Sequence, residues 1–317
     1  MVGGWFDAED LFGALNTYQA IEKQNSGNDN KIVMGPWTHG AWGRQNWDKF
    51  VSYNFGSNTS GYFQKMELDF FNYHLKGKGS FDAGEATIFF TGSNEWKTFA
   101  QWPPKETQSY KLALNANHQL VLNGTATTGM DEYISDPANP VPYINKTAGE
   151  RLSEYMAADQ SFAAKRNDVL HYTSPTLEKD ITLAGPLTAN LSVSMSGTDA
   201  DFIVKIIDVL PDSTETQQLV RAEVLRGKFR NSFENPEPFE PNNINSVKLL
   251  LNDVAHTFKK GHKIMVQVQS TWFPLVDRNP QQFLNIPTAK DADFQKATIK
   301  IYHDSQHPSW IDCLELQ

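Results

Sequence analysis

Two short motifs near the start of the chain contain an acid and a base that could serve in acyl-transfer chemistry. The first, Gly3-Gly4-Trp5-Phe6-Asp7, ends in a carboxylate, and the second, Gly35-Pro36-Trp37-Thr38-His39-Gly40, carries an imidazole. A serine nucleophile needs a neutral imidazole to take its proton, and that imidazole needs a carboxylate on its other nitrogen. Asp7 and His39 are therefore candidates for the acid and base of a catalytic triad.

The third member of such a triad has no candidate in this sequence. In α/β-hydrolases the triad runs Ser, then Asp or Glu, then His, with the Ser in a G-x-S-x-G turn. Only six residues precede Asp7, and no G-x-S-x-G occurs in the 317 residues. If Asp7 and His39 are the acid and base, we expect the nucleophile on sequence outside this chain, which would then be the C-terminal portion of a larger enzyme.

Hydrophobic patterning predicts the elements that would bring the two residues together. Short apolar strands are expected at 2–5 and 31–34, and apolar residues with helical spacing predict helices over 8–24 and 63–75. Asp7 would follow the first strand and His39 the second. Ligand and catalytic sites in parallel sheets collect beyond the carboxyl ends of the strands, so we expect the two side chains to face each other.

Each of these residues also has a simpler interpretation. Asp7 lies between a strand and a helix, where it could be only an N-cap that contributes about 1 kcal/mol. His39 could be a hydrogen-bonded structural residue in a Trp-rich loop. Trp37 and Trp42 could line an acyl pocket or pack between two parts of the molecule. Asp10 could hold a substrate amine, as could the neighbouring Glu9, or it could be an ordinary acid of a first helical turn.

The pattern changes from about residue 83, where period-2 alternation replaces helical spacing. It is clearest from Leu187 to Ser196, where apolar and polar residues alternate strictly, as in a half-buried strand. Further strands are expected at 87–91, 110–114, 119–122, 202–209, 218–225, 246–251, 263–269 and 297–302. We therefore predict an α/β part over residues 1–82 and an antiparallel sandwich of the jelly-roll type over 83–317.

Composition excludes several classes of function. A net charge of −9 and a pI near 5.4 argue against nucleic acid or an anionic membrane surface as a partner. No stretch approaches 18 consecutive apolar residues, so no membrane span is expected, and no secretory signal pattern is seen. The histidines show no HExxH or Cys/His spacing, so neither a metal nor a cofactor is predicted. The single cysteine, Cys313, leaves the compartment undetermined.

The motifs resemble those of a known hydrolase family. The two N-terminal motifs, together with the segments 135–142 (SDPANPVP), 226–232 (RGKFRNS) and 272–280 (WFPLVDRNP), are similar to the X-Pro dipeptidyl-peptidase/α-amino-acid ester hydrolase/cocaine esterase family. Bacterial members are often labelled glutaryl-7-aminocephalosporanic acid acylases. The resemblance implies an α/β-hydrolase domain with a helical cap, followed by a jelly roll. It gives Asp7 the role of triad acid and His39 that of triad base.

The resemblance also implies what this chain lacks and what it would act on. The nucleophilic Ser, the oxyanion-hole donors, the cap and the acidic cluster for a substrate ammonium would lie upstream, so we expect the chain alone to be inactive. Its partners would be the missing N-terminal hydrolase portion, on the same or a separate polypeptide, and a small ester, an amide or a short peptide. An exposed truncated sheet predicts oligomers, and the family suggests a periplasmic or secreted location.

A second hypothesis stays open at this stage. The chain could be a non-catalytic jelly-roll module whose exposed aromatic side chains bind a carbohydrate or a protein. The two hypotheses differ over residues 1–79, for which a lectin-like module has no use.

Overall fold

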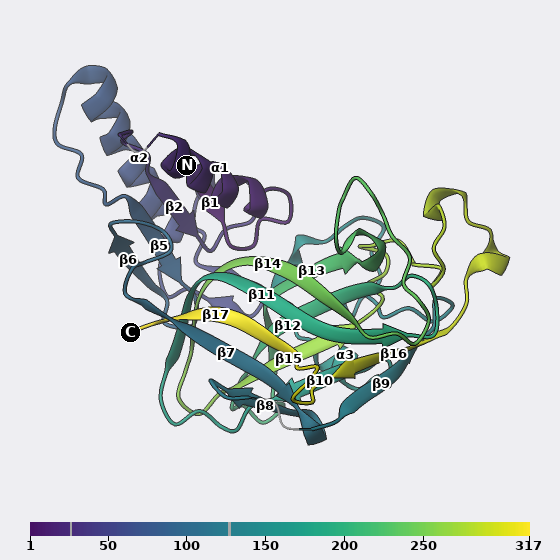
Figure 1. The fold of residues 1–317 in the computed structure, drawn as a ribbon. Coiled ribbons are helices and arrows are strands. Elements are labelled where there is room, and N and C mark those ends of the chain that lie inside the picture. Colours follow the sequence, from purple (N-terminus) through teal and green to yellow (C-terminus); the bar gives the residue numbers. More distant parts are fainter. Residues whose placement is uncertain (26, 126–127) are drawn as a thin grey trace.

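The computed structural model describes residues 1–25, 27–125 and 128–317. It contains two unequal parts, a four-stranded sheet with two long helices and an 11-stranded sheet. Figure 1 shows the helices α1 and α2 and the small sheet at one end of the molecule, with the large sheet filling the rest. The molecule is mostly β-structure, as the sequence predicts for the larger region.

The small sheet has the strand order β1-β2-β5-β6. Strands β1, β2 and β5 are parallel, and β6 is antiparallel to β5. Their bounds are Val2–Gly4 for β1, Ile32–Gly35 for β2, Ala86–Phe90 for β5 and Glu95–Phe99 for β6. The predicted strands at 2–5 and 31–34 are thus confirmed as adjacent parallel strands, and Gly4 pairs with Gly35 where both strands end.

The helix α1 (Leu11–Gln24) connects β1 to β2 and buries one apolar face, formed by Leu11, Ala14, Leu15 and Tyr18. It begins three residues later than predicted. The carboxylate of Asp7 accepts hydrogen bonds from the backbone of the two residues before the helix, which keeps this segment in a turn. The N-cap position is therefore Asp10, and Asp7 lies outside the helix.

The second long helix, α2 (Thr59–Lys76), begins earlier than the predicted 63–75. The Asn58 side chain caps it by accepting a hydrogen bond from the backbone N–H of Gly61, at 3.0 Å. It ends at Gly77, whose φ of 62° is a left-handed conformation that glycine adopts without strain. The two-stranded ribbon of β3 (Lys49–Phe50) and β4 (Tyr53–Asn54) precedes this helix.

The strand predicted at 87–91 belongs to the small sheet and not, as the sequence analysis assigned it, to the sandwich. It is β5, which pairs with β2 in parallel so that Ile32 lies beside Ala86. All five residues of β5 are buried, the pattern of a parallel strand covered on both faces. The predicted boundary between residues 82 and 83 therefore falls inside the small sheet, which continues through β6 to Phe99.

The large sheet has the order β13-β12-β15-β10-β8-β7-β17-β11-β16-β9, and β14 pairs with β11. Apart from a single parallel pairing between β8 and β10, its ladders are antiparallel. The strands are β7 (Thr107–Asn115), β8 (Gln119–Leu122), β9 (Met130–Ser135), β10 (Val169–Thr173), β11 (Ile181–Met195), β12 (Asp201–Val209), β13 (Gln217–Arg226), β14 (Asn245–Phe258), β15 (Lys263–Gln269), β16 (Ala297–Tyr302) and β17 (Trp310–Leu316). The short helix α3 (Ser161–Ala164) precedes β10.

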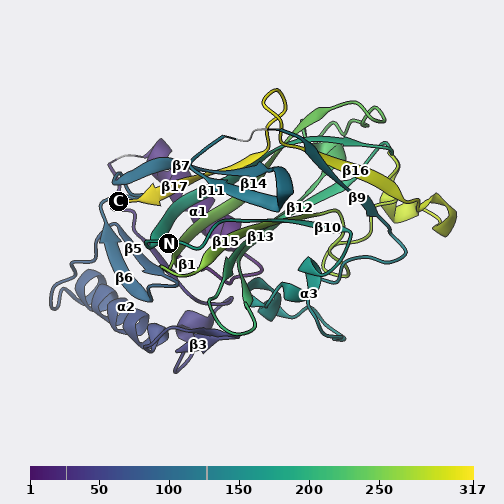
Figure 2. The same ribbon diagram turned by 90° about the horizontal axis from the view of Figure 1, so that it is seen from below.

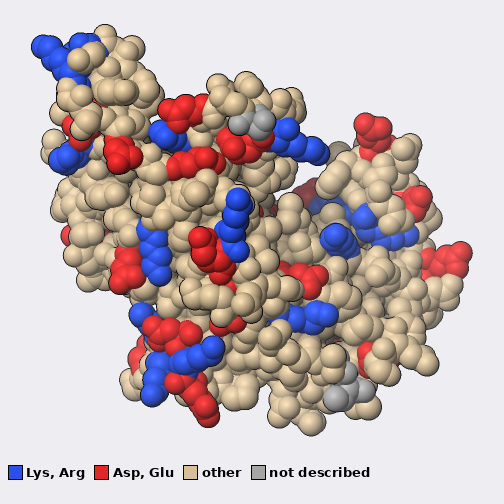
Figure 3. Space-filling view, turned by 60° about the vertical axis from the view of Figure 1, so that its left-hand side comes forward, with Lys and Arg blue, Asp and Glu red and all other residues tan. Residues whose placement is uncertain are grey.

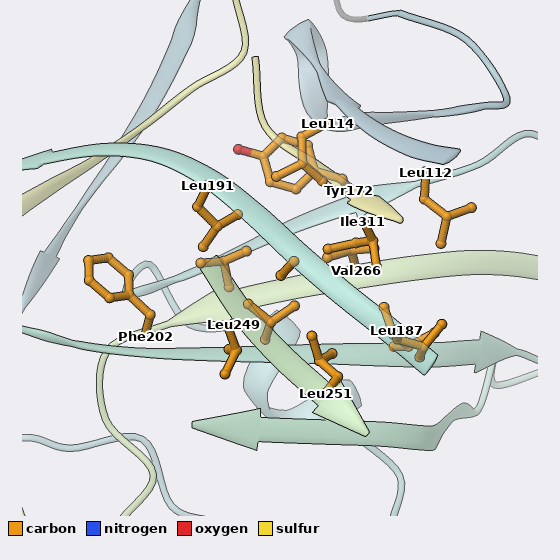
Figure 4. Close-up of a cluster of buried hydrophobic side chains, with 14 of the residues drawn as sticks. Leu112, Leu114, Tyr172, Leu187, Leu191, Phe202, Leu249, Leu251, Val266 and Ile311 are labelled. Atoms are coloured by element: carbon orange, nitrogen blue, oxygen red, sulfur yellow. The ribbon is translucent and has the colours of Figure 1, made fainter. Parts of the chain in front are cut away.

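These strands enclose one large apolar core. Figure 4 shows side chains of β11 and β14, such as Leu191 and Leu251, in a cluster with Phe202 of β12 and Val266 of β15. Each of these residues is almost completely buried. The alternation at 187–196 is confirmed, because Leu187, Leu191 and their apolar neighbours face this core while the polar residues between them, apart from the buried Ser194, are more exposed.

The small sheet packs against one end of the sandwich, with α2 on the outside (Figure 2). The junction contains buried polar contacts as well as apolar ones. The indole of Trp102 donates a hydrogen bond to Asp253 Oδ2 at 2.7 Å, and the hydroxyl of Tyr53 donates to the carbonyl of Leu219 at 3.0 Å. The two parts are therefore joined by directional contacts.

Acidic and basic side chains are interspersed on the face shown in Figure 3. No helix among the described residues combines the length and apolar character that a membrane span requires.

Candidate active site

Backbone pairing continues beyond the ends of β1 and β2 and places the two predicted residues. The amide of Trp5 donates to the carbonyl of Gly35 at 2.8 Å, and that of Phe6 donates to the carbonyl of Trp37 at 3.0 Å. Asp7 and His39 each follow this extension by one or two residues. The register of the two strands therefore brings the side chains together, as the sequence analysis predicts.

Two glycines allow this close approach. A Cβ on Gly4 would lie 2.1 Å from the carbonyl oxygen of Trp37, and one on Gly35 would lie 2.5 Å from the indole of the same residue. Any side chain at either position would push the Trp37 loop away from β1. Gly40, directly after His39, has a φ of 69°, which turns the chain sharply into the short 3₁₀ turn at Ala41–Gly43. Gly4, Gly35 and Gly40 are thus explained by the local backbone structure of the two motifs.

The carboxylate of Asp7 is buried and fully engaged. Its Oδ2 lies 3.0 Å from His39 Nδ1, and its Oδ1 accepts from the backbone N–H groups of Glu9 and Asp10 at 2.9 and 3.0 Å. One oxygen of Asp7 thus orders the turn before α1 while the other binds the imidazole, so Asp7 is not the N-cap of the helix, and its role as triad acid stays a prediction. The two backbone hydrogen bonds hold Oδ1 in place, and they thereby help to direct Oδ2 toward His39.

His39 has the orientation that a general base requires. A carboxylate only accepts hydrogen bonds, so the imidazole donates from Nδ1 to Asp7 and can accept a proton at Nε2. The side chain of His39 is 54% exposed, whereas that of Asp7 is 2% exposed. The hydrogen bond to Asp7 and its negative charge raise the pKa of His39, with smaller contributions from Glu9 and Asp10.

The two tryptophans of the second motif lie in different environments. Trp37 is completely buried, donates from Nε1 to Thr59 Oγ1 at 3.0 Å, and contacts the ring of Phe63. This corrects the prediction that it lines a substrate pocket, because its indole has no surface left for a ligand. Trp42 is half-buried, and its ring meets that of His39 edge-on with the centroids 6.1 Å apart.

The acidic residues that follow Asp7 differ in their partners. Glu9 accepts from Arg151 at 3.2 Å, so its charge is partly neutralised. Asp10 is exposed, and its carboxylate has no hydrogen-bond or ion-pair partner among the described residues. Asp10 therefore contributes the less compensated negative charge near His39. Arg151, which lies in the sandwich part of the sequence, carries no motif, and the sequence analysis missed it.

A cavity of about 240 Å³ lies beside Asp7, between the start of α1 and the sandwich. It is lined by Asp7, Ala8, Glu9, Leu11, Phe12, Tyr155, Met156, Ala222, Glu223, Val224, Asn252, Trp272, Leu275 and Val276. Burial raises the pKa of Glu223, which accepts a hydrogen bond from Asn252 at 2.8 Å. Only the segment from Trp272 to Val276 belongs to a motif that the sequence analysis singled out, and the other sandwich residues of this cavity come from three further segments that carried no functional motif.

Within the described residues, no group of three or more His, Cys, Asp or Glu side chains could hold a metal ion. The arrangement can instead support proton transfer by an oriented imidazole. What it needs for acyl transfer is a hydroxyl nucleophile at His39 Nε2.

Comparison with known proteins finds hydrolases among the proteins similar to this chain. Residues 76–312 match the family described as X-Pro dipeptidyl-peptidase C-terminal non-catalytic domain. The chain is 30% identical to the cocaine esterase of Rhodococcus sp. (strain MB1 Bresler), with 98% of this chain and 55% of that protein aligned. Asp7 and His39 precede the matched family segment, which begins at residue 76.

Two solved structures are similar over nearly the whole chain. An aminopeptidase from the marine sediment archaeon Thaumarchaeota archaeon superposes with a TM-score of 0.94 at 35% identity, covering 100% of this chain and 54% of that one. An α-amino acid ester hydrolase superposes with a TM-score of 0.93 at 33% identity, covering 98% and 54%. The chain thus spans about half the length of the relatives that it matches.

Proposed function

Because this chain belongs to the X-Pro dipeptidyl-peptidase/cocaine esterase family, we propose that it forms the C-terminal part of a serine hydrolase that cleaves acyl ester or amide bonds. The observation that carries the proposal is the contact of 3.0 Å between His39 Nδ1 and the buried Asp7 carboxylate, made by an imidazole whose side chain is 54% exposed. Asp7 is then the triad acid and His39 the triad base.

In this mechanism His39 Nε2 takes the proton of a serine hydroxyl as the hydroxyl oxygen attacks the substrate carbonyl. Asp7 stabilises the resulting imidazolium, which explains the raised pKa of His39. The imidazolium then gives its proton to the leaving alcohol or amine, and an acyl-enzyme remains. Water, deprotonated by the same imidazole, releases the acid and restores the serine.

The serine is supplied by a polypeptide segment outside these 317 residues. In this proposal the small sheet is the C-terminal fragment of an α/β-hydrolase domain, and the large sheet is a jelly roll. Two observations support an additional partner segment. The outer edge of β1 has no neighbouring strand among the described residues, and a groove of about 240 Å³ lies between α2 and the small sheet. The groove is lined mainly by apolar residues, among them Val2, Phe63, Met66 and Phe70.

We further propose that the substrate carries an α-amino group near the scissile bond. The carboxylate of Asp10 lies close enough to His39 to raise the pKa of the imidazole, and no counter-ion pairs with it among the described residues. An ammonium group of the substrate would compensate that charge. Two relatives above 30% identity are named as an aminopeptidase and an α-amino acid ester hydrolase, which both act on substrates with an α-amino group. The half-buried Trp42 is a candidate wall for the acyl side chain.

The test is reconstitution. We expect the 317-residue chain alone to show no hydrolysis of α-amino acid p-nitrophenyl esters. Joined to, or mixed with, the upstream hydrolase segment, it should show turnover that is abolished by His39→Ala and strongly reduced by Asp7→Asn. Turnover by the chain alone that survives His39→Ala would contradict the proposal.

A further inference from the structure

Two arginines from the sandwich bind the backbone carbonyls on either side of Asp7. Arg221, on β13, donates from one terminal nitrogen to the carbonyl of Trp5 at 3.0 Å. Arg151 donates to the carbonyl of Ala8 at 3.1 Å and, through its other terminal nitrogen, to Glu9 Oε1 at 3.2 Å. The segment that carries Asp7 is therefore held at both ends by side chains that lie more than 140 residues away in the chain.

The environment of Arg221 shows that this contact is costly to maintain. Its side chain is buried, and desolvation lowers its pKa. Among the residues that the structure describes, it forms no ion pair, its Nε has no hydrogen-bond partner, and the carbonyl of Trp5 is the acceptor found for its guanidinium. Glu223 and Asp253 act on it only at longer range. Its guanidinium also lies over the ring of Trp5, 6.0 Å from the ring centre, so its hydrogen bond and its cation–π contact both go to Trp5. A buried charge without an ion-pair partner otherwise destabilises a fold.

Arg151 acts on the other side of Asp7 and uses the fork of its guanidinium. Its two terminal nitrogens bind a carbonyl and a carboxylate on consecutive residues, Ala8 and Glu9. The backbone N–H of Glu9 is in turn one of the two donors to Asp7 Oδ1. Lysine has a single nitrogen and cannot reproduce this planar, two-point contact. Arg151 therefore fixes one of the groups that orient the Asp7 carboxylate.

We propose that Arg151 and Arg221 are positioning residues, through which the sandwich sets the placement of Asp7 against His39. This inference rests on the proposed function only in naming Asp7 as the triad acid. In this proposal a region whose family is described as non-catalytic positions a catalytic residue. A displacement of about 1 Å at a catalytic group can lower a rate by about a hundredfold, so two anchors of this kind matter for turnover.

The test uses lysine variants, since lysine keeps the positive charge and removes the guanidinium geometry. Arg221→Lys and Arg151→Lys are made in the 317-residue chain, and the pKa of His39 is measured by NMR together with its Nδ1–H resonance. If the arginines position Asp7, each variant should lower the pKa of His39 by about half a unit or more, because the stabilising carboxylate moves away. The Nδ1–H resonance should broaden as that bond weakens.

The matched control is Arg166→Lys. Arg166 also binds a backbone carbonyl and a carboxylate, those of Asn139 and Asp168, but within the sandwich. This change should leave the His39 titration as it is in the unchanged protein. If Arg221→Lys fails to fold, as judged by circular dichroism, the exposed Arg151 decides the question. Folded variants with an unchanged His39 pKa and Nδ1–H resonance would overturn the proposal.

These readouts need no nucleophile and no substrate. They separate the positioning role from the proposed function, since the Asp7–His39 contact can be perturbed whether or not the protein proves to be a hydrolase. In the reconstituted hydrolase, loss of positioning should appear as a lower kcat with little change in KM.

Discussion

The small sheet and the sandwich differ in how completely they bury their own apolar surface. The sandwich encloses a core in which residues such as Phe202, Leu191 and Val266 are almost fully buried. The helix α2 of the small sheet instead exposes Leu68, Phe71 and Leu75 to 58%, 45% and 75%. Exposed large apolar residues gathered on one element mark an interaction surface in soluble proteins.

The part that carries the proposed triad residues therefore depends on the rest of the molecule for its support. Asp7 and His39 lie on loops of the small sheet, and their surroundings are provided from outside it by the two sandwich arginines and by the walls of the cavity beside Asp7. The sandwich carries its own core and so can serve as the rigid element.

The largest effect is expected from His39→Ala in the reconstituted hydrolase. Removing a triad member lowers kcat by about 10⁴- to 10⁶-fold in serine hydrolases. The side chain is half exposed, so thermal stability should change little. Single-turnover and steady-state rates with an α-amino acid ester measure the loss. His74→Ala on the exposed end of α2 is the matched histidine control, and equal rates in the two variants would remove His39 from the triad.

The contrast in burial predicts losses of stability of very different size for the same kind of truncation. Phe202→Ala opens a cavity in the closed core of the sandwich and should cost about 3–5 kcal/mol of the free energy of unfolding. Phe71→Ala on α2 removes an exposed ring and should change that free energy by less than about 0.5 kcal/mol. Urea denaturation of the 317-residue chain gives both values. A large loss for Phe71→Ala would mean that α2 is already supported within this chain.

The stability of the fold should depend on pH through Asp253, which lies at the junction between the two parts. Burial raises the pKa of Asp253 to about 6, although the indole of Trp102 donates to its carboxylate. The folded state therefore binds a proton that the unfolded state has released between about pH 4 and 6, and stability falls as pH rises through this window. Above pH 6 the carboxylate is ionised in both states, so its destabilising contribution to the free energy of unfolding no longer changes with pH.

Asp253→Asn removes this titration and keeps an acceptor for Trp102. The variant should gain stability relative to the unchanged protein as pH rises from 4 to 6, by up to about 3 kcal/mol, with no further gain above. Denaturation midpoints at a series of pH values measure the difference. A difference that is the same at pH 4 and pH 7 would show that Asp253 does not titrate in this window.

The sequence predicted the fold best where the pattern was local and periodic. The strands at 119–122, 263–269 and 297–302 have the predicted bounds, because alternation and nearby turn residues define them fully. β5 was assigned to the wrong sheet, since an apolar run shows burial but not which neighbour covers it. The strands β6, β9, β10 and β17 were missed. Their residues mix polar and apolar types without strict alternation, and pairing partners distant in sequence stabilise them.

In the candidate site, too, only the features that depend on local sequence were predicted. The pairing of Asp7 with His39 was predicted because two glycine-containing motifs follow adjacent parallel strands. The burial of Trp37 was not, since nothing local shows that Thr59 and Phe63 close over its indole. The supporting arginines were also missed. Their role depends on contacts to backbone carbonyls more than 140 residues away, and such contacts leave no mark on the local sequence.

The smallest effect is expected at Asp10, and it tests whether the small sheet supplies a charge that the substrate uses. Asp10 is the weakest of the carboxylates that raise the pKa of His39, and it is exposed. Asp10→Asn should lower the His39 pKa by a few tenths of a unit, so the acid limb of the reconstituted activity moves to lower pH, because the base stays neutral there. The shift should disappear near 1 M salt, where the Debye length is about 3 Å.

The same variant should discriminate between substrates. If Asp10 pairs with a substrate ammonium, KM rises for an α-amino acid ester and stays the same for the matched ester without the amino group. Asp29→Asn, in the loop beyond α1, removes an exposed charge that pairs with Lys31 and is the control. An equal rise for both esters would show that Asp10 does not recognise the substrate ammonium, because the substitution leaves its backbone hydrogen bond to Asp7 in place.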